Sequence, residues 1–232
     1  MKAEDFRAEL ETQLTWRQDE LRFFSNRLAE ISREDEKDQY RRALVLLLYA
    51  HFEGFCKSAL LTYAKVINDA SVSCNEATPA IAAAGMEPVF SALFNSDSKS
   101  KIFRNSLPDD PKLHRFSRQI DFMEQLSDFL QKTIQIEDEV VDTESNLKPN
   151  VLRKNLFRLG LRHDLFVQHE GAIHNLLNRR NNIAHGADRS GITEKQYTEL
   201  SSAVADTMSV VATELTNAVS AQLYKQPTPT IP

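Results

Sequence analysis

The sequence predicts an all-α protein, and three features of the 232-residue chain lead to this prediction. Apolar residues recur at spacings of three and four over long stretches, which is the spacing of one face of an α-helix. No segment shows the sustained two-residue alternation with glycine-bounded turns that marks β-strands. The prolines gather at 79–149 and 227–232, so residues 1–78 and 150–226 can form uninterrupted helices. We therefore expect a bundle of long antiparallel helices.

Two long helices are predicted in the first proline-free block. The first runs from Leu10 to Ile31, and Arg17 interrupts its apolar pattern. A free coiled coil and a helix packed within its own bundle both fit this pattern, and the interruption favours the packed helix. The second is predicted at residues 36–69. Its centre, residues 43–50, is apolar on all sides, so we expect other helices to surround it.

The middle of the chain predicts shorter elements. A short helix is expected at 89–94, followed by a polar loop. A further helix is predicted at 113–134, and the acidic run at 137–144 is interpreted as a solvated loop and not as a metal site. We expect residues 1–226 to form one domain with an insertion at 79–118, followed by a flexible tail at 227–232. The helix at 113–134 carries a stripe of large apolar residues: Phe116, Ile120, Met123, Leu126 and Leu130.

The last third of the chain contains clear helix boundaries. A short helix is predicted at 151–159 and ends at Gly160. Another is predicted from near Glu170 to Gly186, because glycine commonly adopts the left-handed conformation just past a helix end. The final helix begins with the capping-box pair Thr193 and Gln196. Its apolar positions are Leu200, Val204, Met208, Val211, Leu215 and Leu223.

Composition narrows the possible functions. The cysteines, Cys56 and Cys74, have no metal-binding or redox spacing. The net charge of -5 is not that of a general nucleic-acid coating protein. Basic residues nevertheless concentrate locally: residues 148–180 hold seven Lys or Arg against two acids, and residues 96–118 hold six against three. Either segment also fits a solvated helix face. Without a signal-like start or a bilayer-length apolar run, we expect a cytoplasmic protein that has no membrane contact.

The most informative motif is the run at 178–186, in which four residues separate Arg180 from His185. Arg180 falls on the apolar side of its helix, while Asn181 and His185 form a pair at i and i+4 on the adjacent face. A guanidinium that matches phosphate, an amide and an imidazole therefore border one another. An R-x4-H pair alone is a weak signal because it arises often by chance, so its surroundings must support it.

A second polar patch interrupts the apolar central helix. Tyr49, Glu53 and Lys57 repeat every four residues, and His51 lies between them. One interpretation is an internal Glu53 to Lys57 ion pair next to a tyrosine. The other is that Glu53 or His51 reaches the motif from the facing helix. Under this second interpretation we expect the Glu53 carboxylate to contact the Arg180 guanidinium.

Together these blocks resemble the HEPN superfamily (higher eukaryotes and prokaryotes nucleotide-binding), whose members carry an R-x4-6-H motif late in a helical bundle, here Arg180, Asn181 and His185. The chain looks most like a bacterial RNase-like branch related to RiboL-PSP-HEPN and MAE-type HEPN proteins. In that branch an early helix reads aromatic-x-x-x-Glu-Gly, as at residues 49–54, and a later segment reads Thr-x-Ser-Asn-Leu, as at 143–147, before a helix ending Leu-Gly at 159–160. The resemblance covers residues 40–190.

The resemblance implies a metal-independent endoribonuclease whose composite site forms where two R-x4-H motifs meet in a homodimer. His185 would transfer protons, Arg180 would bind phosphate oxygens and Asn181 would position either group. It implies RNA as the substrate, no cofactor, and a role as a toxin or antiviral defence effector with a separately encoded antitoxin or partner. A HEPN module that binds RNA or protein without cutting remains an alternative, as does an unrelated helical adaptor. The expected supporting residues are Glu53, Tyr49, His51, Lys57, Arg179 and Asn182.

Overall fold

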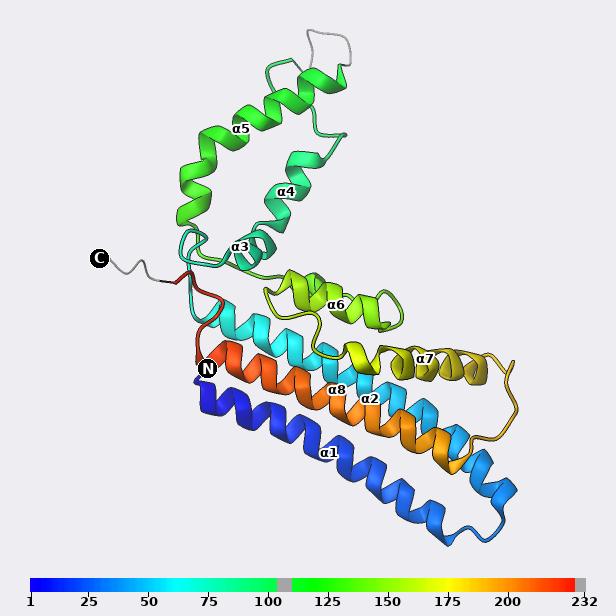
Figure 1. The fold of residues 1–232 in the computed structure, drawn as a ribbon. Helices are drawn as coiled ribbons and strands as arrows, with labels where there is room; N and C mark the ends of the chain where they lie inside the picture. The colour runs from blue at the N-terminus through cyan, green and yellow to red at the C-terminus, as the bar shows by residue number, and fades with distance from the viewer. Residues whose placement is uncertain (104–109, 228–232) are drawn as a thin grey trace.

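The computed structural model describes residues 1–103 and 110–227. Over these residues it contains α-helices and no β-strand, which confirms the predicted all-α class. The long helices α1, α2 and α8 lie side by side, and α7 packs against α2 and α8 (Figure 1). The helices are α1 (Ala3–Glu30), α2 (Glu34–Asp69), α3 (Pro79–Gly85), α4 (Glu87–Phe94), α5 (Pro111–Gln131), α6 (Pro149–Arg158), α7 (Glu170–Ala184) and α8 (Glu194–Ser220), with 3-10 turns η1 (Asp138–Val140) and η2 (Val167–His169).

Helix α2 is the centre of the bundle, as its all-round apolar composition predicts. It packs against α1, α7, α8 and α6, and its buried side chains include Leu48, Phe52 and Phe55. By length and composition alone α2 could also span a membrane. Its position among four other helices explains the same apolar content, because a helix that is apolar on every side must be covered on every side.

Helix α1 begins seven residues earlier than predicted, at Ala3, and Phe6 extends its buried face. The interruption at Arg17 lies on this face. The side chain of Arg17 is buried between α1 and α2, where its guanidinium lies 4.2 Å from the centre of the Trp16 ring and its Nη1 donates to the Gln13 carbonyl oxygen at 2.8 Å. Gly54 of α2 lies next to it, since a Cβ at this glycine would be 3.6 Å from Arg17 Nη2. Arg17 thus fills a position in the packing seam, which agrees with a packed helix.

Helices α4 and α5 pack against each other and form an arm that extends away from the bundle (Figure 1). Asp110 caps the start of α5 by accepting from the backbone amides of Lys112 and Leu113. The helix ends at Gln131, three residues before the predicted end, because the next residues turn into an extended segment. Ile134 is buried there and donates its amide to the Val72 carbonyl at 2.8 Å. This segment anchors the arm to the bundle.

Some sequence predictions fall partly outside the described residues. The polar loop predicted after 94 includes residues 104–109, and the tail predicted at 227–232 lies outside them apart from Pro227. The predicted final stripe is correct up to Leu215 but wrong at Leu223, since α8 ends at Ser220 and Leu223 is exposed.

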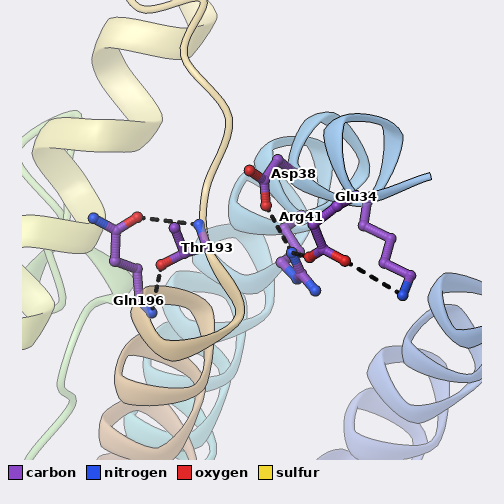
Figure 2. A network of polar contacts seen from close by, with 6 residues as sticks. Glu34, Asp38, Arg41, Thr193 and Gln196 are labelled. Atoms are coloured by element: carbon purple, nitrogen blue, oxygen red, sulfur yellow. Dashed lines mark hydrogen bonds and ion pairs between the residues drawn. The ribbon is translucent and has the colours of Figure 1, made fainter.

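The chain leaves α7 at a left-handed glycine, Gly186, with φ of 72°, and returns to the bundle at Thr193, where the predicted capping box with Gln196 is present. Figure 2 shows that this cap lies beside the start of α2. There the Ile192 amide donates to the Asp38 carbonyl at 3.1 Å, and the buried Arg41 donates to the Asp38 carboxylate at 2.7 Å. The loop that follows the R-x4-H motif is therefore fixed at its far end.

Candidate functional site

Three segments meet at the Arg180 side chain. Its Nη1 donates to Asn146 Oδ1 at 3.0 Å and to Asn181 Oδ1 at 2.8 Å. The guanidinium carbon lies 4.7 Å from the centre of the Tyr49 ring, which is within the range of a cation–π interaction. The motif helix α7, the central helix α2 and the loop before α6 are thereby joined around one cation. Arg180 lies on the inward side of α7, as the sequence predicts.

The loop that presents Asn146 has an unusual backbone. Glu144 and Ser145 have φ of 49° and 66°, a region that residues other than glycine seldom adopt. Two buried contacts hold the loop in place. The Tyr49 hydroxyl accepts from the Leu147 amide at 2.8 Å, and Asn155, which is 1% exposed, donates to the Asp142 carbonyl at 2.8 Å. Strain maintained by surrounding contacts is typical of functional positions.

Arg180 retains unused hydrogen-bonding capacity. Both of its hydrogen bonds use Nη1, so Nε and Nη2 have no partner among the described residues. Neither atom is among the buried polar atoms that lack a partner, and the residue is half-buried. One edge of the guanidinium is thus anchored, while the other donors can reach a ligand. An anchored fork with free donors suits the oxygens of a phosphate.

His185 lies at the C-terminal end of the same helix. It is the residue that caps α7, and its backbone amide donates to the Asn181 carbonyl at 2.9 Å. Its imidazole is exposed and makes no hydrogen bond or ion pair within the part of the chain that the structure describes. The ring is therefore available to a ligand. The same face of α7 carries His174, Asn178, Asn181 and His185, which recur at four, three and four residues.

Glu53 acts on the tyrosine and not on the arginine. Burial, followed by the nearby Glu53 carboxylate, raises the pKa of Tyr49 to about 12. No ion pair joins Glu53 to Arg180 or to Lys57 among the described residues, so the direct contact expected between Glu53 and Arg180 is absent. Lys57 is exposed, one turn further along α2. The arginine is instead satisfied by amide oxygens and an aromatic face.

His51 lies on the opposite side of α2 from Arg180, against α1. Its Nε2 is 2.8 Å from a Glu20 carboxylate oxygen, and its ring meets Trp16 edge to face at 5.3 Å between centres. Burial lowers the pKa of His51, with Glu20 opposing the shift and Arg17 adding to it. The structure thus separates His51 from the other predicted site residues and places it in the α1 to α2 interface.

The remaining predicted residues surround the motif. Arg179 is half-buried and, with Arg42, lowers the pKa of Asp188, although hydrogen bonds from Ser190 are the main cause. The carbonyl of the exposed Asn182 accepts from the amides of Ala187 and Asp188 at 2.8 and 3.1 Å. These contacts shape the turn after His185. They place two further cations, Arg179 and Arg42, near the motif.

Sequence reasoning did not assign roles to Asn146 and Asn155. The signal was present, since Asn146 belongs to the Thr-x-Ser-Asn-Leu block at 143–147. Its contact with Arg180 spans 34 residues, however, and no local pattern predicts such a pairing. Asn155 resembles any polar residue in a short helix until its burial is known.

Among the described residues, neither a metal-binding cluster nor the groove beside α6 lies at the R-x4-H motif. Within residues 1–103 and 110–227, no three His, Cys, Asp or Glu side chains gather in a way that could hold a metal ion. A groove of about 710 Å³ lies between α3, η1 and α6 and is lined by Ala83, Phe157 and Arg158 among others, with no residue of the R-x4-H motif.

Comparison with models of known protein families gives a match over most of the chain. The family model described as RiboL-PSP-HEPN covers residues 12–217. The chain belongs to the RiboL-PSP-HEPN family. The match extends over most of α1, which lies outside the sequence blocks at 40–190, and over the arm, in which none of those blocks lies. It makes this chain a HEPN-type domain, a class of RNase-like or RNA-binding modules. No curated protein and no solved structure matches the chain.

Proposed function

We propose that this HEPN domain is a metal-independent endoribonuclease that cuts RNA at a site built on Arg180, Asn181 and His185. The observation that carries the proposal is the arrangement of Arg180. Asn146, Asn181 and Tyr49 anchor its guanidinium and its remaining donors are free, while the exposed imidazole of His185 lies at the end of the same helix.

The chemistry follows from these groups. A ribose 2′-hydroxyl loses its proton and its oxygen attacks the adjacent phosphorus. The bond from phosphorus to the 5′-oxygen breaks, and that oxygen takes up a proton. The products are a 2′,3′-cyclic phosphate and a 5′-hydroxyl. His185 serves in one proton transfer, and Arg180 stabilises the charge on the non-bridging oxygens. Glu53 supports the site indirectly, through the buried Tyr49 that braces both Arg180 and the loop.

A second imidazole is needed because proton removal and proton donation occur on opposite sides of the phosphorus in an in-line displacement. Within one chain His174 lies 11 residues from His185, about 16 Å along the helix, which is too far to serve the same phosphate. The stripe is symmetric about the midpoint of Arg179 and Arg180. A two-fold antiparallel contact would therefore bring His174 of one copy to His185 of another. We include this homodimer in the proposal.

Cleavage in excess chelator tests the mechanism. Purified protein incubated with mixed RNA and EDTA is expected to cut and to leave 2′,3′-cyclic phosphate ends. Arg180→Ala and His185→Ala are each expected to abolish cutting while circular dichroism shows unchanged helix content, since neither side chain belongs to the apolar core. Loss of activity in EDTA that magnesium restores would refute the mechanism. Wild-type rates in both variants would refute the site.

Mixing variants tests the composite site. His174→Ala and His185→Ala copies should each be inactive alone. Mixed at equal concentration, they form hybrid dimers in which one of two sites keeps both histidines, so partial activity should return. No recovery, with hybrid dimers demonstrated by mass, would contradict the His174 pairing. A site made from two copies of His185 predicts instead that His174→Ala is active on its own.

The biological role proposed for this activity is that of a toxin or antiviral defence effector in the cytoplasm, acting on cellular RNA and controlled by a separately encoded antitoxin. A HEPN module that does not cut RNA is the second candidate. The net charge of -5 favours it, because a negatively charged chain can bind a protein partner as readily as RNA. Retention of labelled RNA without any cleavage, by protein shown to be folded, would favour this second function.

A further inference from the structure

The arm exposes its apolar side chains and buries polar ones. Of the twelve large apolar side chains that are exposed among the described residues, six lie between Phe94 and Leu130. The fully buried residues of α5 are His114 and Ser117, and α4 has none. A surface that concentrates apolar side chains in this way marks an interaction site.

Outward apolar residues of α5 follow one seam, which Ser127 interrupts. Positions 113, 116, 120, 123, 127 and 130 alternate by three and four residues, which is the a and d spacing of a coiled coil. Only Ser127 is polar. The exposed fractions are 59% for Phe116, 45% for Ile120, 63% for Met123 and 41% for Leu130. The opposite side of α5 faces α4, where Phe122 packs between Phe90 and Phe129.

The charges on α5 change sign along its length. Arg118 and Asp121 line the groove that α5 forms with α4. Away from that groove, the first half of α5 carries Lys112 and Arg115 and no acid, while its second half carries Glu124 and Asp128 and no base. A helix with this distribution is complementary to a second copy of itself in the antiparallel direction, because each basic half then lies along an acidic half. In the parallel direction like charges would meet.

We propose that α5 pairs with α5 of a second copy of this chain as an antiparallel coiled coil across a two-fold axis between Asp121 and Phe122. In this register Leu113 meets Leu130, Phe116 meets Ser127 and Ile120 meets Met123. Every layer joins an a position to a d position, as antiparallel pairing requires. The contact is isologous, since the same residues serve both copies.

Two features of α5 argue against other occupants. A membrane-binding helix carries basic residues along its whole polar face, whereas half of α5 is acidic. An RNA strand would be repelled by the same acidic half and gains little from an aliphatic seam. Self-complementarity of both the charges and the layers favours a copy of this chain.

The arm contact is separate from the contact proposed at α7, because the arm extends away from the bundle (Figure 1). It is also small. Helix α5 has 21 residues, about 30 Å at 1.5 Å per residue, so three heptads carry the seam. Interfaces of this size give weak, concentration-dependent association.

Disulfide trapping tests the register and direction. Copies with Leu113→Cys are mixed with copies with Leu130→Cys and oxidised. The antiparallel pair predicts a cross-linked product in the mixture and little in either variant alone. The native Cys56 and Cys74 are buried and do not compete. Cross-linking of Leu113→Cys with itself, or none in the mixture, would overturn the proposal.

A charge placed in the seam tests the energy of the contact. Met123→Asp is expected to weaken the self-association made by the arm at least tenfold in sedimentation equilibrium, leaving only the contact proposed at α7, without changing helix content. The control Val167→Asp alters a side chain that is 54% exposed on η2 and should associate as wild type does. Unchanged association of Met123→Asp would refute the arm contact. The arm contact would also be refuted if the wild-type protein did not self-associate and its arm bound acidic vesicles or an added protein instead.

Discussion

The bundle and the arm use apolar residues in opposite ways. In the bundle, α2 buries Phe52, Phe55 and Tyr63 among neighbouring helices, and its polar Tyr49 is braced against Arg180. In the arm, α5 turns Phe116 and its apolar neighbours outward. The same helical periodicity therefore gives a core in one region and a free surface in the other. The difference is whether the chain itself supplies a covering helix.

The largest expected effect comes from the same substitution in the two regions. Phe52→Ala should lower the free energy of unfolding by about 3–5 kcal/mol, because it leaves a cavity in the fully buried core. Phe116→Ala should change it by less than about 0.5 kcal/mol in dilute protein, since more than half of that side chain is exposed. Urea denaturation of both variants measures the difference. Equal losses would remove the distinction between bundle and arm.

A smaller effect is expected for the loop that holds Arg180. Asn146→Ala removes the acceptor for Arg180 Nη1 and should slow RNA cleavage about tenfold to a hundredfold, the equivalent of one hydrogen bond to a charged group. The control Asn95→Ala makes the same change at the end of α4, on the arm. Cleavage rates of the two variants test the assignment. An Asn146→Ala rate equal to that of the control would leave Asn146 without a role.

The smallest effect concerns pH and the α1 to α2 interface. Burial lowers the pKa of His51 although Glu20 opposes it, and Arg17 from α1 lowers it further. The unfolded chain then binds a proton more readily than the native state below the ordinary histidine pKa of about 6.5. Wild-type stability should fall as pH drops through this value, by less than about 1.4 kcal/mol per pH unit. His51→Gln should lack this component, and an identical pH profile in both proteins would contradict it.

Sequence patterns predicted the helices well where local residue spacing determines a helix boundary or the side of the helix on which a residue lies. The capping box at Thr193, the left-handed Gly186 and the inward position of Arg180 all follow from local spacing. Local spacing did not predict the contacts of Arg180. Glu53 is a charged candidate partner one helix away, yet the nearer acceptor is an amide in a strained loop. Which of two partners the half-buried Arg180 takes depends on backbone placement, and local patterns do not specify it.

The proposal that the Arg180 site cleaves RNA is tested most directly with one defined RNA that carries a label at its 3′ end. The cleavage rate is measured under single-turnover conditions in excess EDTA. Wild type and Arg180→Ala are compared with Arg22→Ala, which removes an equal charge from the exposed side of α1. We expect cleavage with a new 5′-hydroxyl end in wild type and Arg22→Ala, and a rate reduced at least a hundredfold in Arg180→Ala. Equal rates in all three proteins would contradict it.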